Sequence, residues 1–461
     1  MELPARFVER MTQELGPDEA EKLCRALGSE PSTSVRLNPF KPMADRWGDY
    51  GAREVAWSHK GYMLDQRPSF TLDAAFHAGA YYVQEASSQF AGYILSQVCG
   101  GEENCKGLRV LDMCAAPGGK STHYASIVGL EGLVVANEIN RSRASVLADN
   151  ARKWGLGNMV VTCNDSSRIA AFEEWFDVVA VDAPCSGEGM FRKSDDACEQ
   201  WSDANVAMCA ERQWEILQNA FAALDAGGVL IYSTCTFNRS EDEDIVSRLL
   251  EASGEELVEA PKVEVKEDWG VVTGRVGVFQ TFRFFPHRLT GEGMFMAVAK
   301  KAGEPSLRRR APKSKRQLIT ALDKKSSEVL SRWVQNPEQM RYFAAGEMLY
   351  GCRKEHYADI EALSSNLAVI YSGVAMGQIF KGSLKPDGAL ALYVGLRREQ
   401  VECRELSSEQ ALQFLRKQEL EAEWFKEGVN MVLCEGLPLG FVKRVGGRVN
   451  NMYPNSLRIL K

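Results

Sequence analysis

The stretch VLDMCAAPGGKST, residues 110–122, begins with an apolar, β-branched run and then changes to small residues that lead into a helix-like segment. A strand that enters a helix through Ala115, Ala116, Gly118 and Gly119 leaves room for a ligand to approach the backbone. The free N–H groups and the positive potential of the helix N-terminus suit a carboxylate or a phosphate. We therefore predict a strand–loop–helix unit that binds a ligand.

Two common phosphate-binding motifs do not describe this loop. Gly119-Lys120-Ser121 resembles the end of a P-loop, but that motif requires glycine five positions before Gly119, where Cys114 stands. The stretch does not match GxGxxG either. The sequence therefore does not predict a nucleoside triphosphate site.

From about residue 107 to residue 300, short apolar runs alternate with helix-like segments. The runs are LRVLDMCAA, GLVVANEI, NMVVTCND, FDVVAVDAP and GGVLIYSTC. This alternation predicts a Rossmann-like α/β core, in which helices cover both faces of a parallel sheet. Ligands of such folds bind beyond the carboxyl ends of the strands, where the chemically unusual residues of this chain fall.

Two segments of this region are predicted to be helices that pack on the sheet. They are YYVQEASSQFAGYILSQVCG, residues 81–100, and ANVAMCAERQWEILQNAFAALDAGG, residues 204–228. Their predicted packing residues are Phe90, Ile94, Leu95 and Val98 in the first, and Met208, Trp214, Leu217 and Phe221 in the second. The Gly227-Gly228 pair is predicted to end the second helix.

The chain of 461 residues is long enough for about three domains. Residues 1–75 are predicted to be a small α+β domain and residues 76–300 the catalytic domain. KKAGEPSLRRRAPKSKR has no apolar period and is rich in cations, so residues 301–317 are predicted to be a basic linker. Residues 318–461 are predicted to be a C-terminal α+β region, with a helix in ITALDKKSSEVLSRWVQ and a hairpin that turns at Gly446-Gly447.

Charge is distributed unevenly along the chain. Residues 301–461 contain 26 Lys and Arg against 18 Asp and Glu, whereas residues 1–300 contain 29 against 44. A basic C-terminal part is typical of a polyanionic partner, although chance variation of the surface explains the charge equally well. Lys443, Arg444 and Arg448, beside the hairpin, either bind phosphate or form a solvated basic edge.

Composition excludes several other classes of protein. The N-terminus has no signal peptide pattern and no apolar run reaches the roughly 18 residues of a membrane span, so we expect a soluble cytoplasmic protein with no membrane partner. The 12 cysteines show no disulfide framework, and the absence of CxxC and HExxH argues against a metal site. Most thiols are expected in the core, with one or two reactive.

Acidic residues at successive strand ends indicate the cofactor. Glu138 ends the second strand, about 20 residues beyond the glycine loop, which suits a ribose diol. Asp165 ends the third strand and could accept a hydrogen bond from an adenine amino group. Either acid alone would more often be a helix cap. Their order after a carboxylate-binding loop predicts S-adenosylmethionine (SAM).

Two thiols follow the next two strands. Cys185 lies in VDAPCSGEGMFRK, three residues after Asp182, and Cys235 lies in YSTCTFNRSEDE. Neighbouring parallel strands would bring both sulfurs into one pocket beside the methyl donor. With no histidine nearby in sequence, this is not the pattern of a papain-type hydrolase.

Carbon methylation of a pyrimidine requires such a thiol. C5 of cytosine is a weak nucleophile until a thiolate adds to C6 and raises the electron density at C5. Asp182 could hold N3 and the exocyclic amine as charge develops there, and Lys120 could lower the thiol pKa or stabilise the adduct. The target base must leave any helix to be reached. Spacing alone does not decide which thiol attacks.

PCSGEGMFRK, CAAPGGKST, YSTCTFN and RFFPHRLTGEGMFMA resemble the RNA 5-cytosine methyltransferases of the Sun/nucleolar-protein family, especially their bacterial RsmF type. SVRLNPF, residues 34–40, and the segment FHAGAYYVQEASS, residues 76–88, are similar to the N-terminal part of that type. KPDGALAL and LPLGFVKRVGGRVNNMYP resemble its PUA-like C-terminal region. Glu241-Asp242-Glu243 stands where Glu-Asn-Glu is usual in the family.

The resemblance implies a function and a role for each site residue. Cys235 would be the nucleophile, Cys185 would help to release the product, and Asp182 and Lys120 would complete the catalytic site. The implied SAM-binding residues are Cys114, Ala115, Ala116, Pro117, Gly118, Gly119, Lys120, Glu138, Arg143, Asp165 and Asp182. The implied activity is formation of 5-methylcytosine in 16S rRNA of the small ribosomal subunit by a monomer whose N-terminal domain and PUA-like region bind RNA.

Some alternatives stay open from the sequence. The substrate could be tRNA, or the chain could be a non-catalytic RNA-binding assembly factor on the same fold, although the complete set of catalytic motifs argues against the latter. His287 and Arg288 suit a structural turn and RNA contact about equally. Tyr81, Tyr82 and Trp57 are predicted to lie in the core or an interface rather than to stack on bases.

Overall fold

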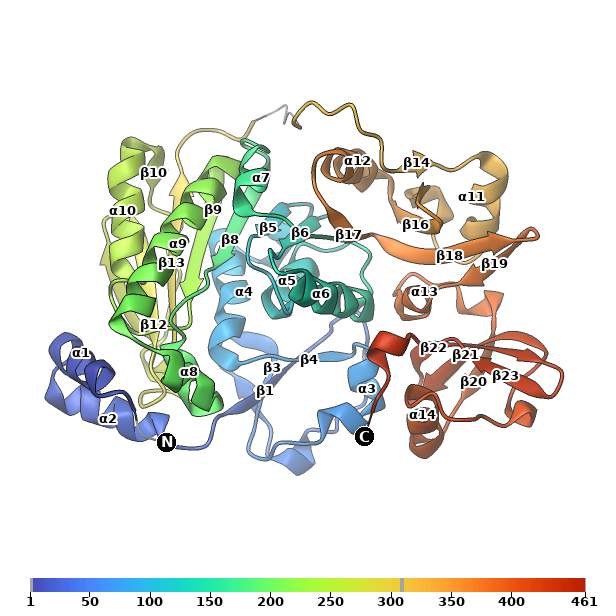
Figure 1. Ribbon diagram of the computed structural model, residues 1–461, viewed down its shortest axis with the longest axis horizontal. Coiled ribbons are helices and arrows are strands. Elements are labelled where there is room, and N and C mark those ends of the chain that lie inside the picture. The colour runs from blue at the N-terminus through green and yellow to red at the C-terminus, as the bar shows by residue number, and fades with distance from the viewer. Residues whose placement is uncertain (1–2, 307–310, 461) are drawn as a thin grey trace.

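A computed structural model describes residues 3–306 and 311–460 of the chain. Within these residues the centre is a ten-stranded sheet of order β11-β12-β13-β9-β8-β5-β6-β7-β17, with β10 paired to β13 (Figure 1). Five central strands run parallel: β5 (Arg109–Asp112), β6 (Leu133–Asn137), β7 (Met159–Thr162), β8 (Phe176–Asp182) and β9 (Leu224–Thr234). Antiparallel strands extend both sides: β10 (Leu257–Val258), β11 (Val272–Val276), β12 (Phe279–Phe284), β13 (Met294–Lys301) and β17 (Val369–Ser372).

Helices cover both faces of this sheet, which confirms the predicted α/β core. One face packs against α4 (Ala86–Val98), α5 (Gly119–Ile127) and α6 (Arg141–Trp154). The other face packs against α7 (Ser166–Ala170), α9 (Asp203–Ala223) and α10 (Glu243–Ser253). Because β8 and β9 lie next to each other and run parallel, the loops that follow them meet at one edge.

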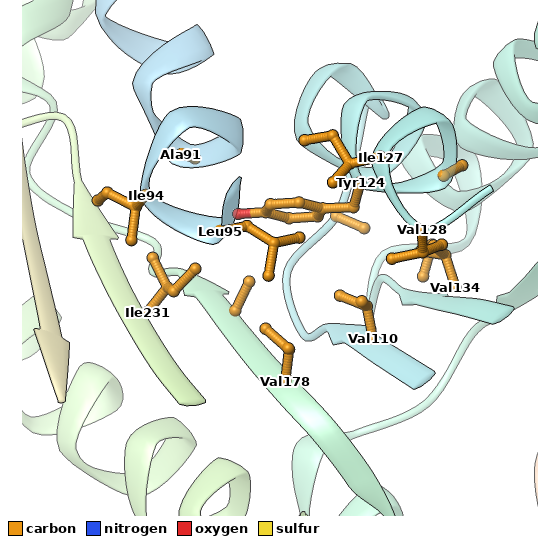
Figure 2. Close-up of a cluster of buried hydrophobic side chains, with 14 of the residues drawn as sticks. Ala91, Ile94, Leu95, Val110, Tyr124, Ile127, Val128, Val134, Val178 and Ile231 are labelled. Carbon is orange, nitrogen blue, oxygen red and sulfur yellow. The ribbon is translucent and has the colours of Figure 1, made fainter. Parts of the chain in front are cut away.

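The helix predicted over residues 81–100 is shorter than expected, because Tyr81–Val83 is strand β4 and α4 begins at Ala86, but its predicted apolar face is buried. Phe90, Ile94 and Leu95 are 0% exposed, and Val98 is 7% exposed. Figure 2 shows Ile94 and Leu95 near the β-branched side chains of β5, β8 and β9. Burial of such side chains stabilises the fold by about 1.5–3 kcal/mol each, so the packing of α4 on this face of the sheet contributes strongly to stability.

The predicted end of α9 is wrong. The helix stops at Ala223 and β9 begins at Leu224, so Gly227-Gly228 lies inside the strand. Leu224 pairs with Phe176 of β8, and Gly227, with φ +70°, lies where the pairing of these strands is irregular. Sheet pairing therefore ends the helix before the glycines do. Met208 is 53% exposed, so its predicted packing role is wrong as well.

The N-terminal residues form a helical hairpin and a small sheet. The hairpin is α1 (Ala5–Leu15) and α2 (Pro17–Leu27), and the sheet has the order β2 (Arg53–Val55), β3 (Ser58–Leu64), β1 (Thr33–Leu37), β4 (Tyr81–Val83). Tyr81 and Trp57 are buried, as predicted, and Tyr82 is half-buried. Phe7 of α1 contacts Phe191 with ring centroids 5.0 Å apart, which places the hairpin against the loop that carries Cys185.

The described C-terminal residues form two sheets. One has five strands: β14 (Thr320–Ala321), β15 (Met340–Ala345), β16 (Met348–Arg353), β18 (Val374–Phe380) and β19 (Ser383–Pro386). The other has four: β20 (Glu402–Glu405), β21 (Gly428–Cys434), β22 (Leu437–Val445) and β23 (Arg448–Asn451). Helices α11 (Lys324–Ser331), α12 (Tyr357–Asn366), α13 (Gly388–Leu392) and α14 (Ser408–Leu415) pack with them. The hairpin predicted at Gly446-Gly447 joins β22 to β23.

The C-terminal part is joined closely to the rest of the chain. Strand β17 pairs with β7 and so extends the central sheet. The four-stranded sheet and α14 share an apolar core with the N-terminal sheet. The predicted helix of residues 319–335 is shorter than expected, because Thr320 and Ala321 pair with β15 and Asp323 caps α11 through Ser326. Of the predicted linker, residues 307–310 lie outside the described residues, and Lys301 still belongs to β13.

Candidate active site

A cavity of about 1140 Å³ opens at the carboxyl ends of the parallel strands. Its lining includes many of the predicted site residues: Cys114, Ala116, Glu138, Arg143, Asp165, Asp182, Cys185 and Cys235. A smaller cavity of about 150 Å³ lies beside it and is lined by Ala115, Pro117, Gly119 and Lys120, together with Cys114, Ala116 and Asp182. The larger cavity has the size of a cofactor site, with room left for part of a second substrate.

Gly118 has a different position from the rest of the glycine loop. It does not line either cavity, and it caps α5 with φ +112°, a conformation that side chains other than glycine rarely adopt. A Cβ at this position would lie 3.0 Å from Leu147. Gly118 therefore shapes the turn that directs the start of α5 toward the cavities.

Lys120 and Asp182 form an ion pair beside the thiols. Lys120 Nζ lies 2.9 Å from Asp182 Oδ2, and Ser233 Oγ donates a 2.8 Å hydrogen bond to Asp182 Oδ1. Burial of Lys120 opposes its charge, but the Asp182 carboxylate outweighs this effect and raises the lysine pKa above its ordinary value. Lys120 is therefore held in its charged form, and Ser233 fixes the orientation of the Asp182 carboxyl group.

The two acids predicted to contact the cofactor lie at neighbouring strand ends. Glu138 is 3% exposed, accepts a 2.9 Å hydrogen bond from Asn140 N and lies 3.3 Å from the Arg143 guanidinium. Asp165 accepts hydrogen bonds from Ser167 Oγ (2.6 Å) and Ser167 N (3.0 Å), which lower its pKa. Asp165 thus caps α7 and is also an ionised carboxylate at the cavity wall.

The two thiols meet at the wall of the larger cavity. Cys185 Sγ and Cys235 Sγ are 3.0 Å apart. The hydrogen bond to Cys235, together with burial, raises the pKa of Cys185 well above the usual range of a thiol. Cys185 therefore keeps its proton at neutral pH. The sequence correctly predicts that the strand ends bring these two cysteines together.

Asp112 is a site residue that the sequence analysis missed. It ends β5, is 1% exposed, and accepts a 2.6 Å hydrogen bond from Ser121 Oγ at Oδ2. Its Oδ1 is buried with no hydrogen-bond partner among the described residues. Burial raises the pKa of Asp112 to about 7. The sequence did contain a signal for this residue, because an aspartate ends the first predicted strand just before the glycine loop.

These residues fit SAM, which carries an ammonium group, a carboxylate, a ribose and a sulfonium. The unpaired Asp112 oxygen and the acidic lining suit the cationic parts, and Glu138 suits the ribose hydroxyls. The described residues contain no group of three or more His, Cys, Asp or Glu that could hold a metal ion. No helix within the described ranges is long and apolar enough to cross a membrane.

His287 and Arg288 have contacts that support a structural role. His287 Nε2 lies 3.1 Å from Glu19 Oε2, and Arg288 donates hydrogen bonds to the same oxygen. Glu19 belongs to α2, so both side chains tie the N-terminal hairpin to the turn after β12. Their contacts agree with the turn interpretation rather than with a free RNA-binding surface.

The fold and the site define a SAM-dependent methyltransferase whose main cavity is lined in part by two cysteines. Three family models match the chain: "16S rRNA methyltransferase RsmB/F" over residues 102–300, "N-terminal domain of 16S rRNA methyltransferase RsmF" over residues 3–86, and "Methyltransferase RsmF PUA domain" over residues 402–459. The ribosomal RNA small subunit methyltransferase F of Erwinia tasmaniensis is 30% identical over 479 residues, covering 98% of this chain and 96% of that protein. The chain belongs to this RsmF family.

Further relatives agree with this assignment. The methyltransferase F of Salmonella paratyphi A is 30% identical over 442 residues, covering 92% of this chain and 90% of that protein. A crystal structure of a methyltransferase homologue from Pyrococcus horikoshii is 25% identical, with a TM-score of 0.52 over 64% of this chain and 94% of that one. The structure of NSun6 from the same organism with SFG, at 19% identity and a TM-score of 0.52 over 65% and 99%, shows the shared fold.

Proposed function

We propose that this chain forms 5-methylcytosine in 16S rRNA through a covalent bond between Cys235 Sγ and C6 of the target cytosine. The observation that carries the proposal is the 3.0 Å approach of Cys185 and Cys235 beside the Lys120–Asp182 pair, at the wall of the cavity that also contains the cofactor acids. Family membership supports ribosomal RNA as the substrate. We also propose that it acts as a monomer in the cytoplasm.

The cofactor would lie along the first three strand ends. Residues Cys114, Ala115, Ala116, Pro117, Gly118, Gly119 and Lys120 form its loop, and Glu138, Arg143, Asp165 and Asp182 complete its surroundings. Asp112 would accept hydrogen bonds from the ammonium group of the cofactor, because its Oδ1 is buried and unpaired among the described residues. When bound, SAM supplies an electrophilic methyl group.

The first chemical step uses the thiolate of Cys235. Its sulfur adds to C6, and the electrons of the C5–C6 double bond move toward C5, the carbon that accepts the methyl group. Asp182 orients N3 and the exocyclic amine of the base, while Lys120 stabilises the negative charge near the ring. Cys185 gives the proton that it carries at rest to water, and N3 of the base takes up a proton from water as this charge develops.

Product release reverses the addition. The Cys185 thiolate removes the proton from C5, the C5–C6 double bond forms again, and the Cys235 sulfur leaves with the electrons of its carbon bond. The ring N–H formed earlier returns its proton to water. The environment that raises the pKa of Cys185 also makes its thiolate a strong proton acceptor, which suits this role.

Transfer of labelled methyl groups tests the proposal. Small ribosomal subunits and tRNA, both from cells that lack this protein, are incubated with the protein and labelled SAM, and 5-methylcytosine is mapped by sequencing. We expect methylation of 16S rRNA that Cys235→Ala abolishes while SAM binding survives. Cys403→Ala, at an exposed C-terminal cysteine, is the matched control. Normal turnover by the Cys235 variant, or methylation of tRNA alone, would refute the proposal.

A further inference from the structure

Two carboxylates are buried between the loops that carry the thiols. Glu188 follows Cys185 by three positions and Glu241 follows Cys235 by six, and both are 0% exposed. Neither carboxylate lines the active-site cavity. Burying a carboxyl group is costly unless hydrogen bonds compensate it, so the hydrogen-bond partners of these two groups explain their presence.

Glu188 receives hydrogen bonds mainly from the loop of Cys235. Its Oε2 accepts from Thr236 Oγ1 (2.5 Å), Phe237 N (2.8 Å) and Asn238 N (3.1 Å). Its Oε1 accepts from Asn238 Nδ2 (3.0 Å) and from Trp201 Nε1 (3.0 Å). The Glu188 side chain thus accepts hydrogen bonds from all three residues that follow Cys235 in the other loop.

Glu241 makes the reciprocal connection. Its Oε1 accepts from Ser186 N at 2.8 Å, and its Oε2 accepts from Ser186 Oγ at 2.5 Å, so it holds the residue next to Cys185. Gln213 Nε2 donates to Glu241 Oε1 (2.9 Å) and also to the carbonyl of Pro184 (3.0 Å). Asn238 Nδ2 lies 2.7 Å from Glu241 Oε2 and therefore links both carboxylates.

We propose that Glu188 and Glu241 are positioning residues that fix the two cysteine loops to each other and thereby set the separation of the Cys185 and Cys235 sulfurs. This inference rests on the proposed function for its chemical meaning, because one thiol must reach C6 while the other reaches the proton on the neighbouring C5. A direct backbone contact agrees with it, since Gly189 N donates a 2.9 Å hydrogen bond to Cys235 O.

The chemistry of the donors explains why glutamate occupies position 188. The five groups that point at the Glu188 carboxyl group are N–H or O–H donors, and both of its oxygens accept hydrogen bonds from them. Glutamine has nearly the same shape, but its NH₂ group would face donors on one side. Glu188→Gln therefore changes the hydrogen bonding of this position while it keeps the volume. Glu199→Gln, on an exposed part of α8 (Asp195–Gln200), is the matched control.

Disulfide formation in the free protein measures the separation of the sulfurs without RNA or SAM. Diamide takes two electrons and two protons from the two thiols and becomes the hydrazine, while one S–S bond forms. Peptide mapping after a timed quench follows the Cys185–Cys235 bond among the other thiols. We expect Glu188→Gln to form this bond at least about tenfold more slowly than the wild type, because disulfide geometry is specific. The Glu199 control should match the wild type.

Turnover provides the second readout. A displacement of about 1 Å costs up to about 100-fold in rate, so Glu188→Gln should lose about that factor in kcat while its Kd for SAM and its KM for the RNA stay within about twofold. General destabilisation would change Tm and SAM binding instead. Thr236→Val, which removes a single donor to Glu188, is the milder variant used if Glu188→Gln does not fold.

The outcomes separate this inference from the proposed function. Slower disulfide formation in Glu188→Gln, or in Thr236→Val if the first does not fold, supports the positioning role. Disulfide formation at the wild-type rate in the variant that folds would overturn it. A wild-type protein that forms the disulfide rapidly but never methylates cytosine would refute the proposed function and leave the positioning role intact.

Discussion

Replacement of Asp112 by asparagine should change how the stability of the protein depends on pH. Asp112 lies at the end of β5 with one oxygen bonded to Ser121 and the other buried without a partner among the described residues. Burial raises its pKa from 3.8 to about 7 in the folded protein. The carboxylic acid form is therefore the one that the folded chain tolerates, and asparagine is its neutral isostere.

The magnitude follows from this shift. A group whose pKa is raised on folding contributes stability that is fully present below the unfolded pKa and is lost as pH rises through the folded pKa. Since each pKa unit corresponds to 1.36 kcal/mol, the wild type should lose about 3 kcal/mol through Asp112 between pH 5 and pH 8.5. Asp112→Asn lacks this loss. Because Asp112 is almost fully buried, solvent screening reduces the effect little.

Urea unfolding of the SAM-free protein at pH 5 and pH 8.5 measures the difference. We expect the free energy of unfolding of Asp112→Asn to rise relative to the wild type by about 3 kcal/mol across this range. The reason is that the aspartate ionises more readily in the unfolded than in the folded protein, whereas asparagine does not ionise in either state. At pH 8.5 the variant should still bind SAM more weakly, because it lacks the charge that faces the ammonium group. Parallel pH profiles of the two proteins would contradict the buried, partnerless position of this carboxyl.

Four further predictions concern the core, the domain contact and the site. Phe90→Ala should lower the free energy of unfolding by about 3–5 kcal/mol in urea, because it leaves a cavity beneath α4, and a loss below about 1 kcal/mol would contradict this packing. Arg109→Met should lower the free energy of unfolding in urea by about 2 kcal/mol, because it leaves the mostly buried Asp359 carboxyl group without its ion-pair partner. Lys120→Met should reduce methyl transfer by about 100-fold without loss of folding, and unchanged transfer would exclude its role. Cys185→Ala should accumulate a covalent RNA–protein species, seen as a slow band on a denaturing gel, and normal product release would contradict its assignment.

The central fold was predictable because its signals are local. Apolar β-branched runs specify the buried parallel strands, and the residues that follow each strand must meet at one edge of the sheet. The positions of Cys185 and Cys235 follow from this rule alone. The boundary at Leu224 did not follow, because its pairing with Phe176 is a contact between distant residues and overrides the glycine signal.

The parts that sequence reasoning missed depend on non-local contacts. Strand β17 pairs with β7 although about 200 residues separate them, and neither segment signals its partner. The same holds for Glu188, which lies in the glycine-rich stretch SGEGM and is fully buried because it accepts hydrogen bonds from the loop after the next strand. Asp112 reads as the polar end of a strand, and only burial in the fold gives it a raised pKa.

Trapping with a mechanism-based substrate tests the central claim most directly. Small-subunit RNA that carries 5-fluorocytidine at the methylated position cannot lose a proton from C5, so the enzyme remains bound after methyl transfer. With SAM present, we predict one covalent RNA adduct, which peptide mapping places on Cys235. An adduct on Cys185, or no adduct from a protein that methylates normal RNA, would contradict the account.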